Sequence, residues 1–413
     1  MKNEYIKRTS QSIVFLLIGS VLLLLSSCEN DSYEFELTDG NPEVFYVRLT
    51  DPESADSLLV AAYMDDVICL VGSNLRSIRE LYFNDQKAVL NTSFITDNTL
   101  IVNVPKTIPD EVSNKIYMVS SEDTVSYEFS VLVPNPVVNS MSCEYAHIGN
   151  EVSIYGDYFI DDPNVPLTIN MAGNVPVTQI TSIEKTKVSF IIPEGAQKGY
   201  INVASIYGTG RSKFQYLDDR GMILDWDNLN ASGGWRSGVI RNDNPVEGIS
   251  GGYVYFNGEM QGEVGATWNE DGFSFNLWGV SNGRPEGDLF NTPVEEAVMK
   301  FEINVPQAWS AGAMQMIFTP WGLSGTNAYI YDDSMPRGVW EPWAVTGSYT
   351  TDGWVTVSIP LSDFKYTRFG YPLELASEGN YGGLTFFVHA GINPGTTCNP
   401  EICIDNIRVV PAE

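Results

Sequence analysis

The chain has 413 residues, a formal net charge of −29 and a hydrophobic fraction of 43%. That hydrophobic fraction is sufficient for packed cores, and the length predicts about two to four domains. The large excess of acidic residues, with no cluster of Lys and Arg, argues against nucleic acids and anionic polysaccharides as ligands. A neutral ligand meets no such repulsion.

Residues 1–27 predict a signal peptide that directs export. Three basic residues precede an apolar run at 13–25, which is too short for an ordinary membrane span. The sequence Leu-Ser-Ser-Cys at 25–28 resembles the bacterial lipobox, and the resemblance implies cleavage before Cys28 and lipidation of that cysteine. The alternative is an ordinary signal peptide or a retained anchor helix. No later segment is apolar enough to span a bilayer, so the lipid would be the only membrane anchor.

Residues 28–40 form the expected tether, and they begin with Cys28-Glu-Asn-Asp. An acidic stretch directly after the lipidated cysteine resembles the surface-export signal of lipoproteins from Gram-negative glycan-foraging bacteria. The resemblance implies an outer-membrane protein that faces the cell exterior.

After the tether, short strand patterns alternate with turn residues at a spacing of about ten residues, which predicts all-β sandwiches. One pattern occurs twice. Residues 67–75 correspond to 152–159, and in both copies a strand leads into a glycine, Gly72 or Gly156. A later strand in each copy ends in a proline, Pro105 or Pro193. The glycines are 84 residues apart and the prolines 88, and such similar spacing predicts tandem domains of one kind with small loop differences.

The two copies resemble the immunoglobulin-like IPT/TIG family. The resemblance predicts one Ig-like β-sandwich at 41–134 and a second at 135–217, with Pro134-Asn-Pro136 at the junction. Neither copy contains a tryptophan or a cluster of ligand-binding residues, so we expect both to be spacers.

Residues 218–413 predict a larger β-sandwich of the jelly-roll type that many carbohydrate-binding modules use. In 298–305 the residues Met299, Phe301, Ile303 and Val305 share one face, and Val355, Val357, Ile359 and Leu361 do so in the strand at 354–361. The stretches 305–315 and 352–361 resemble the C-terminal domain of surface glycan-binding proteins from TonB-coupled uptake systems, such as the xyloglucan-binding one. Lipobox, tandem Ig-like spacers and this domain occur there in the same order.

All nine tryptophans lie between Trp226 and Trp354. An exposed indole ring suits the flat C–H face of a sugar, and tryptophan is enriched where proteins bind partners. Those that share a face with polar residues or lie in Gly/Pro-rich loops are candidates for carbohydrate binding: Trp278, Trp321, Trp340, Trp343 and Trp235. Their alternative role is to cap the sandwich beneath its loops. Trp226, Trp309 and Trp354 are expected to pack in the core. Candidates for hydrogen bonds to sugar hydroxyls are Asn276, Gln315, Asp332, Asp333, Arg236 and Arg337.

Cys398 and Cys403 are close enough in sequence for a local disulfide in an oxidising compartment, although free thiols are an equal alternative. We expect no metal site and no cofactor, because the two histidines, His147 and His389, lie in different domains outside any ligand or triad pattern. The carboxylate motif of retaining jelly-roll glucanases is missing, which argues against a glycoside hydrolase.

These patterns predict a non-catalytic lipoprotein that binds a neutral polysaccharide, a plant β-glucan or a hemicellulose such as xyloglucan. The resemblance implies that it captures this glycan beside a TonB-dependent transporter and its associated glycan-binding lipoprotein. The alternative is a cell-surface adhesin that recognises a protein, because loop tryptophans suit that role too.

Overall fold

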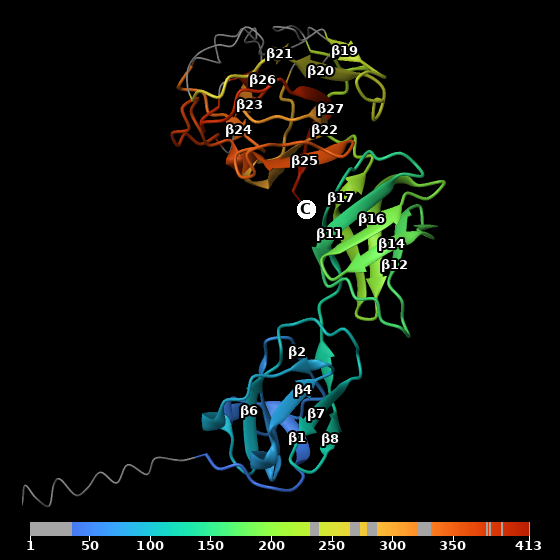
Figure 1. Ribbon diagram of the computed structural model, residues 1–413, viewed down its shortest axis with the longest axis vertical. Coiled ribbons are helices and arrows are strands. Elements are labelled where there is room, and N and C mark those ends of the chain that lie inside the picture. Colours follow the sequence, from blue (N-terminus) through green and yellow to red (C-terminus); the bar gives the residue numbers. More distant parts are fainter. Residues whose placement is uncertain are drawn as a thin grey trace, which may run out of the picture. The chain divides into compact units, whose positions relative to one another are not determined.

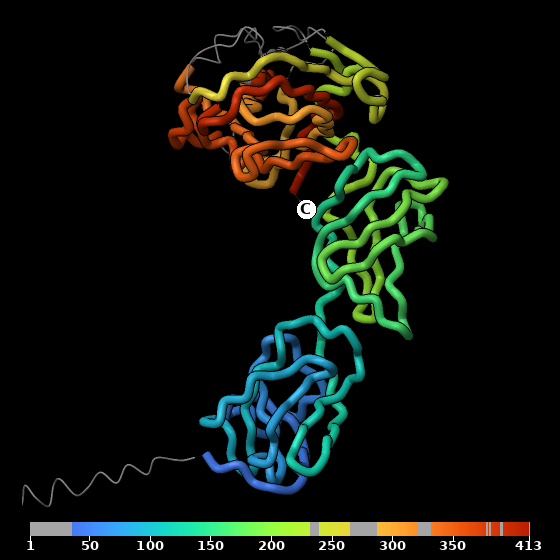
Figure 2. Tube along the Cα trace, viewed as in Figure 1, coloured from blue at the N-terminus to red at the C-terminus, as the bar shows by residue number. Residues whose placement is uncertain are grey.

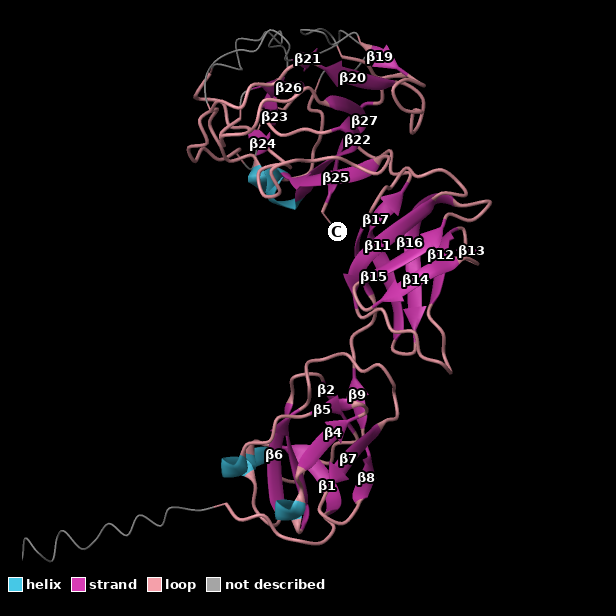
Figure 3. Ribbon diagram, viewed as in Figure 1, coloured by secondary structure: helices cyan, strands magenta, loops and turns pink. Residues whose placement is uncertain are grey.

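The computed structural model describes residues 35–231, 239–264, 273–278, 287–320, 332–376, 379, 381–389 and 391–412, with the backbone alone for 273–278 and 389. Strands form almost all regular structure in these residues (Figures 1 and 3). The helical elements are single 3-10 turns: η1 (Pro52–Ser54), η2 (Leu75–Ser77), η3 (Thr92–Phe94), η5 (Val294–Glu296) and η7 (Leu361–Asp363). The predicted all-β class is confirmed. None of the described residues belongs to a helix that is long and apolar enough to cross a membrane.

The chain divides into two compact units, Met1–Leu132 and Val133–Glu413. The first unit holds the sheets β1-β3-β6 and β5-β4-β7-β8 and the parallel pair β2-β9. Leu81 and Phe83 of β4 and Ile116 and Met118 of β7 alternate with half-buried neighbours and pack inward. The strands are β1 (Glu43–Leu49), β2 (Ala61–Tyr63), β3 (Val67–Ser73), β4 (Glu80–Phe83), β5 (Gln86–Lys87), β6 (Thr99–Asn103), β7 (Lys115–Val119), β8 (Thr124–Glu128) and β9 (Ser130–Leu132).

The second unit begins with another Ig-like sandwich, whose strands follow the order β13-β12-β16-β17-β10-β11-β15-β14. A short parallel contact between β10 and β17, Val138 opposite Ser212, joins its two halves. Ile154, Phe190 and Phe214 are fully buried between them. The strands are β10 (Val137–Met141), β11 (Glu151–Asp157), β12 (Thr168–Ala172), β13 (Val175–Pro176), β14 (Ile180–Glu184), β15 (Lys187–Ile191), β16 (Gln197–Ser205) and β17 (Gly208–Tyr216).

The glycine that recurs in the two sequence copies has the same structural role in both. Gly72 in β3 and Gly156 in β11 each lie beside a register shift in the neighbouring strand. A Cβ atom at Gly72 would lie 1.9 Å from the carbonyl oxygen of Glu43, and one at Gly156 would lie 1.8 Å from that of Val137. Only glycine permits this close approach of two backbones. The repeated residue therefore marks the same bulged strand pair in each sandwich.

The rest of the second unit is the larger sandwich, built from a sheet β19-β20-β27-β22-β25, with β18 on β27, and a sheet β21-β26-β23-β24. The last strand of the chain lies between β20 and β22, so segments distant in sequence become neighbours (Figure 2). The strands are β18 (Met222–Leu224), β19 (Ile240–Arg241), β20 (Tyr253–Asn257), β21 (Phe273–Trp278), β22 (Ala297–Gln307), β23 (Ala313–Thr319), β24 (Gly338–Trp340), β25 (Val355–Pro360), β26 (Gly383–His389) and β27 (Glu401–Pro411).

The core of this sandwich contains the residues that strand alternation assigns to it. The inward set of β22, from Met299 to Val305, is fully buried, and Val355, Val357 and Ile359 of β25 pack against it. Trp226 and Trp309 are also buried in this core, as expected, and the indole N–H of Trp309 donates to the carbonyl oxygen of Ala311 at 2.6 Å. Trp354, expected in this core, is instead half-buried on the outer face of the sheet, where it packs on Tyr253 with ring centroids 5.4 Å apart.

The second Ig-like sandwich docks on the outer face of the sheet that contains β22 and β27, through a buried ion cluster. Glu144 accepts from Lys300 at 2.6 Å and from Arg408 at 2.8 Å, and Arg408 also donates to Glu302 at 2.8 and 3.0 Å. Thr356 completes the contact, since its hydroxyl donates to Glu302 and accepts from the backbone N–H of Glu144. Burial lowers the pKa of Arg408, but Glu144 and Glu302 raise it by more. The pKa is therefore raised overall and this residue stays charged.

The suggested disulfide between Cys398 and Cys403 is not formed, and both residues are free thiols. The reason is strand alternation. Ile402 and Ile404 of β27 point into the core, so Cys403 between them points outward, where it packs with Tyr253 and Tyr255. Cys398 instead packs against the core, and its sulfur accepts from the N–H of Ser310. The two thiols therefore lie on opposite faces of the sheet, and their Cβ atoms cannot approach as a disulfide requires.

Candidate functional site

The second Ig-like sandwich docks on the outer face of only one of the two sheets of the larger sandwich. The contacts that tie the second Ig-like sandwich to this domain use Lys300, Glu302, Thr356 and Arg408, all on the sheet that contains β22 and β27. We therefore take the outer face of β21-β26-β23-β24 as the candidate site and call it the four-stranded face.

Strand register sets out the side chains of this face in rows. Gln315 of β23 lies beside Phe387 of β26, Ile317 lies beside Thr385, and Thr319 lies beside Gly383. The alternate residues, Met314, Met316, Phe318, Leu384, Phe386 and Val388, belong to the core. The face thus mixes polar and apolar groups. Its described side chains on β23 and β26 are buried, with Met335 packed against Ile317 and Phe387, so they support the sheet and do not themselves contact a ligand.

Trp278 is located on this sheet by its backbone. It ends β21, opposite Gly383, and Gly383 in turn lies opposite Thr319. Gly383 and Thr319 are both buried. The side chains of Trp278 and Asn276 lie outside the described residues, as do Trp235, Arg236 and Trp321 entirely. The binding role of these three tryptophans stays a prediction.

Arg337 organises the edge of the four-stranded face. It is fully buried, and its guanidinium donates to the side-chain oxygen of Gln315 and to the carbonyl oxygen of Asp332, both at 3.0 Å. Burial lowers its pKa to about 10, which leaves it charged at neutral pH. The suggestion that Arg337 and Gln315 reach out to sugar hydroxyls needs correction, because both are buried and bonded within the protein. Their role is to hold the edge of the sheet in place.

Trp343 also differs from expectation. Its side chain is only 3% exposed, and its indole N–H donates to the carbonyl oxygen of Gly312 at 2.8 Å. A ring so completely covered has no face for a sugar, so the sequence-based assignment of Trp343 to the binding platform is wrong. It has the alternative role, packing beneath the loops.

Trp340 is half-buried and belongs to the same aromatic layer. Its ring makes edge contacts with Phe301, Trp309 and Tyr349, with centroids 5.7–5.8 Å apart. These contacts give it a packing role, and at most the exposed part of its ring is available to a ligand.

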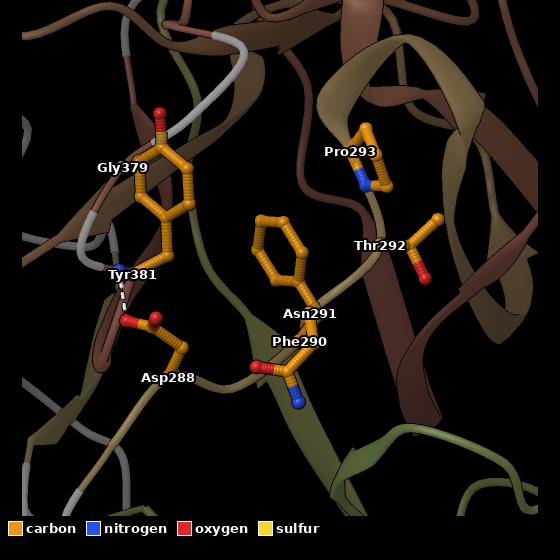
Figure 4. A pocket seen from close by; sticks show the side chains of 7 residues that line it. All are labelled: Asp288, Phe290, Asn291, Thr292, Pro293, Gly379 and Tyr381. Carbon is orange, nitrogen blue, oxygen red and sulfur yellow. Dashed lines mark hydrogen bonds between the residues drawn. The ribbon is translucent and has the colours of Figure 1, made fainter.

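A pocket of about 260 Å³ opens beside β26, and the sequence patterns did not predict it. Figure 4 shows the rings of Phe290 and Tyr381 side by side in it; their centroids are 5.3 Å apart and their planes differ by 13°. Asp288 accepts from the backbone N–H of Tyr381 at 2.6 Å. Asn291, Thr292, Pro293 and Gly379 complete the lining.

No local sequence pattern indicates this pocket. Its two walls are 93 residues apart in the chain, and they meet only because the sheet aligns them. Burial raises the pKa of Tyr381, so its hydroxyl stays protonated and donates to the carbonyl oxygen of Ala376 at 2.6 Å. Aromatic walls next to hydroxyl, amide and carboxylate groups can accommodate a small uncharged polar ligand. Within the described residues, no group of acidic, Cys or His side chains could hold a metal ion.

Comparisons with known proteins show the family of this chain. The model of a family described as surface glycan-binding protein B xyloglucan binding domain matches residues 216–411, which is the larger sandwich. The crystal structure of a surface glycan-binding protein B from Prevotella bryantii is 37% identical to this chain and covers 91% of it and 100% of its own chain, with a TM-score of 0.78.

Two more distant relatives also span most of the chain. An IPT/TIG domain-containing protein from Bacteroides ovatus is 22% identical over 99% of this chain and 100% of its own length. A surface glycan-binding protein B from a xyloglucan utilization locus of Bacteroides uniformis is 20% identical over 90% of this chain and 100% of its own, with a TM-score of 0.47.

Proposed function

The chain belongs to the surface glycan-binding protein B family, and from this premise we propose that it holds a neutral polysaccharide at the cell surface without cleaving it. The observation that carries the proposal is the similarity to the Prevotella bryantii protein, which extends over all three sandwiches. The family description that matches residues 216–411 names xyloglucan, which makes a xyloglucan-type hemicellulose the first candidate ligand.

The binding platform in this proposal is the four-stranded face, with Trp278, Trp321 and Trp235 as its aromatic rings. Trp340 lies opposite Met314 and packs on Phe301, so its ring points into the core and is not part of this face. Covering one face of an indole buries about 100 Å², which is worth roughly 2–3 kcal/mol. Two or three such rings offset the cost of association and leave a binding free energy of about −6 to −8 kcal/mol. This corresponds to a dissociation constant in the micromolar range. Such an affinity permits capture followed by release.

The same proposal includes attachment through lipidated Cys28 to the outer membrane, with the protein facing outward. The captured glycan would pass to a TonB-dependent transporter and its associated glycan-binding lipoprotein. The anchor is tested by Cys28→Ser in the producing cell. We expect this variant to be absent from the detergent-extracted membrane fraction. Retention of most of the variant in that fraction would contradict the lipid anchor.

Affinity gel electrophoresis of residues 29–413 on a panel of soluble neutral polysaccharides tests the binding function. We expect retardation of the wild type on xyloglucan and its loss in Trp278→Ala, which stays folded by circular dichroism. Tyr63→Ala, an exposed aromatic change in the first unit, is the matched control and should be retarded like the wild type. No retardation on any polysaccharide would overturn the proposal and favour an adhesin that recognises a protein.

A further inference from the structure

An exposed aromatic turn lies next to the four-stranded face. Phe369 is 43% and Tyr371 is 68% exposed, and they are the only aromatic residues among the large exposed hydrophobic side chains of the described part of 218–413. Phenylalanine and tyrosine rings are costly to leave in water, and paired exposed rings next to a binding face indicate a contact surface. We call residues Thr367–Tyr371 the aromatic turn.

Hydrogen bonds hold the aromatic turn in one conformation. The N–H of Thr367 donates to the carbonyl oxygen of Tyr371 at 2.8 Å, and the N–H of Tyr371 donates to the hydroxyl of Thr367 at 3.1 Å. Gly370 has a φ of +79°, which a residue with a side chain rarely adopts, and this conformation lets the chain reverse between the two rings. The backbone that carries the two rings is therefore ordered before binding, which lowers the entropic cost of ordering the turn.

The backbone next to the turn adds an isolated β-bridge at the edge of the four-stranded face. Tyr366 pairs with Arg337, which directly precedes β24, and Tyr366 also pairs with Pro372 on the returning side of the turn. The order is thus β21, β26, β23, the segment 337–340, and then Tyr366. Four strand spacings separate the row of Trp278 from Tyr366, roughly 19 Å. Only a chain of several sugar rings can bridge such a distance.

Side-chain contacts also connect the turn to the face. Arg368 lies over the ring of Phe369 at 4.4 Å from its centroid and pairs with Asp333 at 2.9 Å. The neighbouring Asp332 accepts from Arg337 through its carbonyl oxygen, and Arg337 donates to Gln315 of β23. The aromatic turn is therefore fixed to the sheet and not an independent loop.

We propose that the aromatic turn is an outlying subsite of the four-stranded face, where Phe369 and Tyr371 stack on sugar rings of a long neutral polysaccharide. The inference rests on the proposed function and adds to it a preference for chain length. A polysaccharide that runs above the covered strands, from the row of Trp278 to the edge of the sheet, reaches the turn, whereas a short oligosaccharide bound near Trp278 does not. The Arg368–Asp333 pair is electrically neutral overall and offers donors and acceptors to sugar hydroxyls.

The experiment compares the double variant Phe369→Ala/Tyr371→Ala with wild type by isothermal titration calorimetry. The ligands are soluble xyloglucan polymer and, as the short oligosaccharide, cellobiose, whose two backbone rings are too short to bridge the distance from the row of Trp278 to the turn. We expect the variant to bind the polymer at least about tenfold more weakly and the oligosaccharide within about twofold of wild type. Tyr371→Phe should retain polymer binding, because stacking needs the ring and not the hydroxyl.

Phe45→Ala/Tyr63→Ala is the matched control, since these residues are 56% and 59% exposed in the first unit. It should leave both affinities unchanged. Equal polymer binding by wild type and the turn variant would overturn the subsite and leave the proposed function intact. Equal loss of polymer and oligosaccharide would also overturn it, because the turn would then belong to the central site. Failure of wild type to bind either ligand would contradict the proposed function itself.

Discussion

Trp343 shows how a tryptophan in a Gly/Pro-rich loop can belong to the core. Its ring is covered by the loops around it, and a Cβ atom added to Gly395 would lie 2.9 Å from the ring. Trp343→Ala should therefore lower the free energy of unfolding by about 3–5 kcal/mol, because it leaves a large cavity and an unpaired carbonyl at Gly312.

Urea unfolding of residues 29–413 measures this loss, and Trp343→Phe, which keeps most of the packing, should lose less. The variant that remains folded should keep its affinity for the polysaccharide. Unchanged stability together with lost glycan binding would return Trp343 to the binding platform.

Asp405 gives the protein a pH-dependent stability. It is buried, and this burial raises the pKa of its carboxyl to about 8, although hydrogen bonds from Ser250 and the N–H of Asn406 oppose the rise. In the unfolded chain an aspartate titrates near pH 4. Between about pH 4 and 8 the unfolded chain releases a proton that the folded chain retains, so the free energy of unfolding falls as pH rises.

In Asp405→Asn the free energy of unfolding should depend less on pH over this interval. The stability of the variant relative to that of wild type should be highest near pH 8. Urea unfolding at several pH values between 5 and 8 measures the two slopes. Identical slopes for wild type and variant would show that Asp405 does not titrate there.

At the scale of elements, β22 and β27 join the second Ig-like sandwich to the larger one through Lys300, Glu302 and Arg408. Glu144, which lies between β10 and β11, is the partner from the other side. Removal of one partner from a buried ion cluster leaves charge without compensation in a medium of low polarity. Glu144→Gln should therefore lower the free energy of unfolding of the second unit by about 3–5 kcal/mol.

The control is Glu128→Gln, which breaks the exposed pair with Lys115 in the first unit and should have a much smaller effect. Differential scanning calorimetry of residues 29–413 separates the two units. Equal effects of both changes would mean that the buried cluster contributes no more than a surface pair.

At the scale of the whole molecule, the net charge of −29 makes the affinity for a charged ligand depend on salt concentration, whereas the affinity for a neutral ligand should not. Raising the salt concentration from 0.1 to 1 M shortens the screening length from about 10 to about 3 Å. If sugar rings stack on aromatic side chains, the affinity for xyloglucan should change by less than about threefold over this range. A loss of tenfold or more by calorimetry would indicate recognition through charge, as expected for a basic protein partner.

Much of the fold was predictable because strand alternation and turn residues are local signals. The inward residues of β22 and β25, the all-β class and the recurring Gly72 and Gly156 all follow from patterns within one or two strands. The site was less predictable. Trp343 and Arg337 lie in sequence contexts typical of surface loops, yet both are buried, because burial depends on which distant segments cover a residue.

The sequence by itself determined the all-β class and the order of the sandwiches, and its charge predicts a neutral ligand, since composition, repeats and strand patterns are properties of the chain alone. Only the tertiary structure decided which sheet face docks on the second sandwich, that Cys398 and Cys403 point apart, and that Phe290 meets Tyr381. These facts depend on strand register between segments tens to hundreds of residues apart. Register of this kind results from packing the whole sandwich, and no local pattern encodes it.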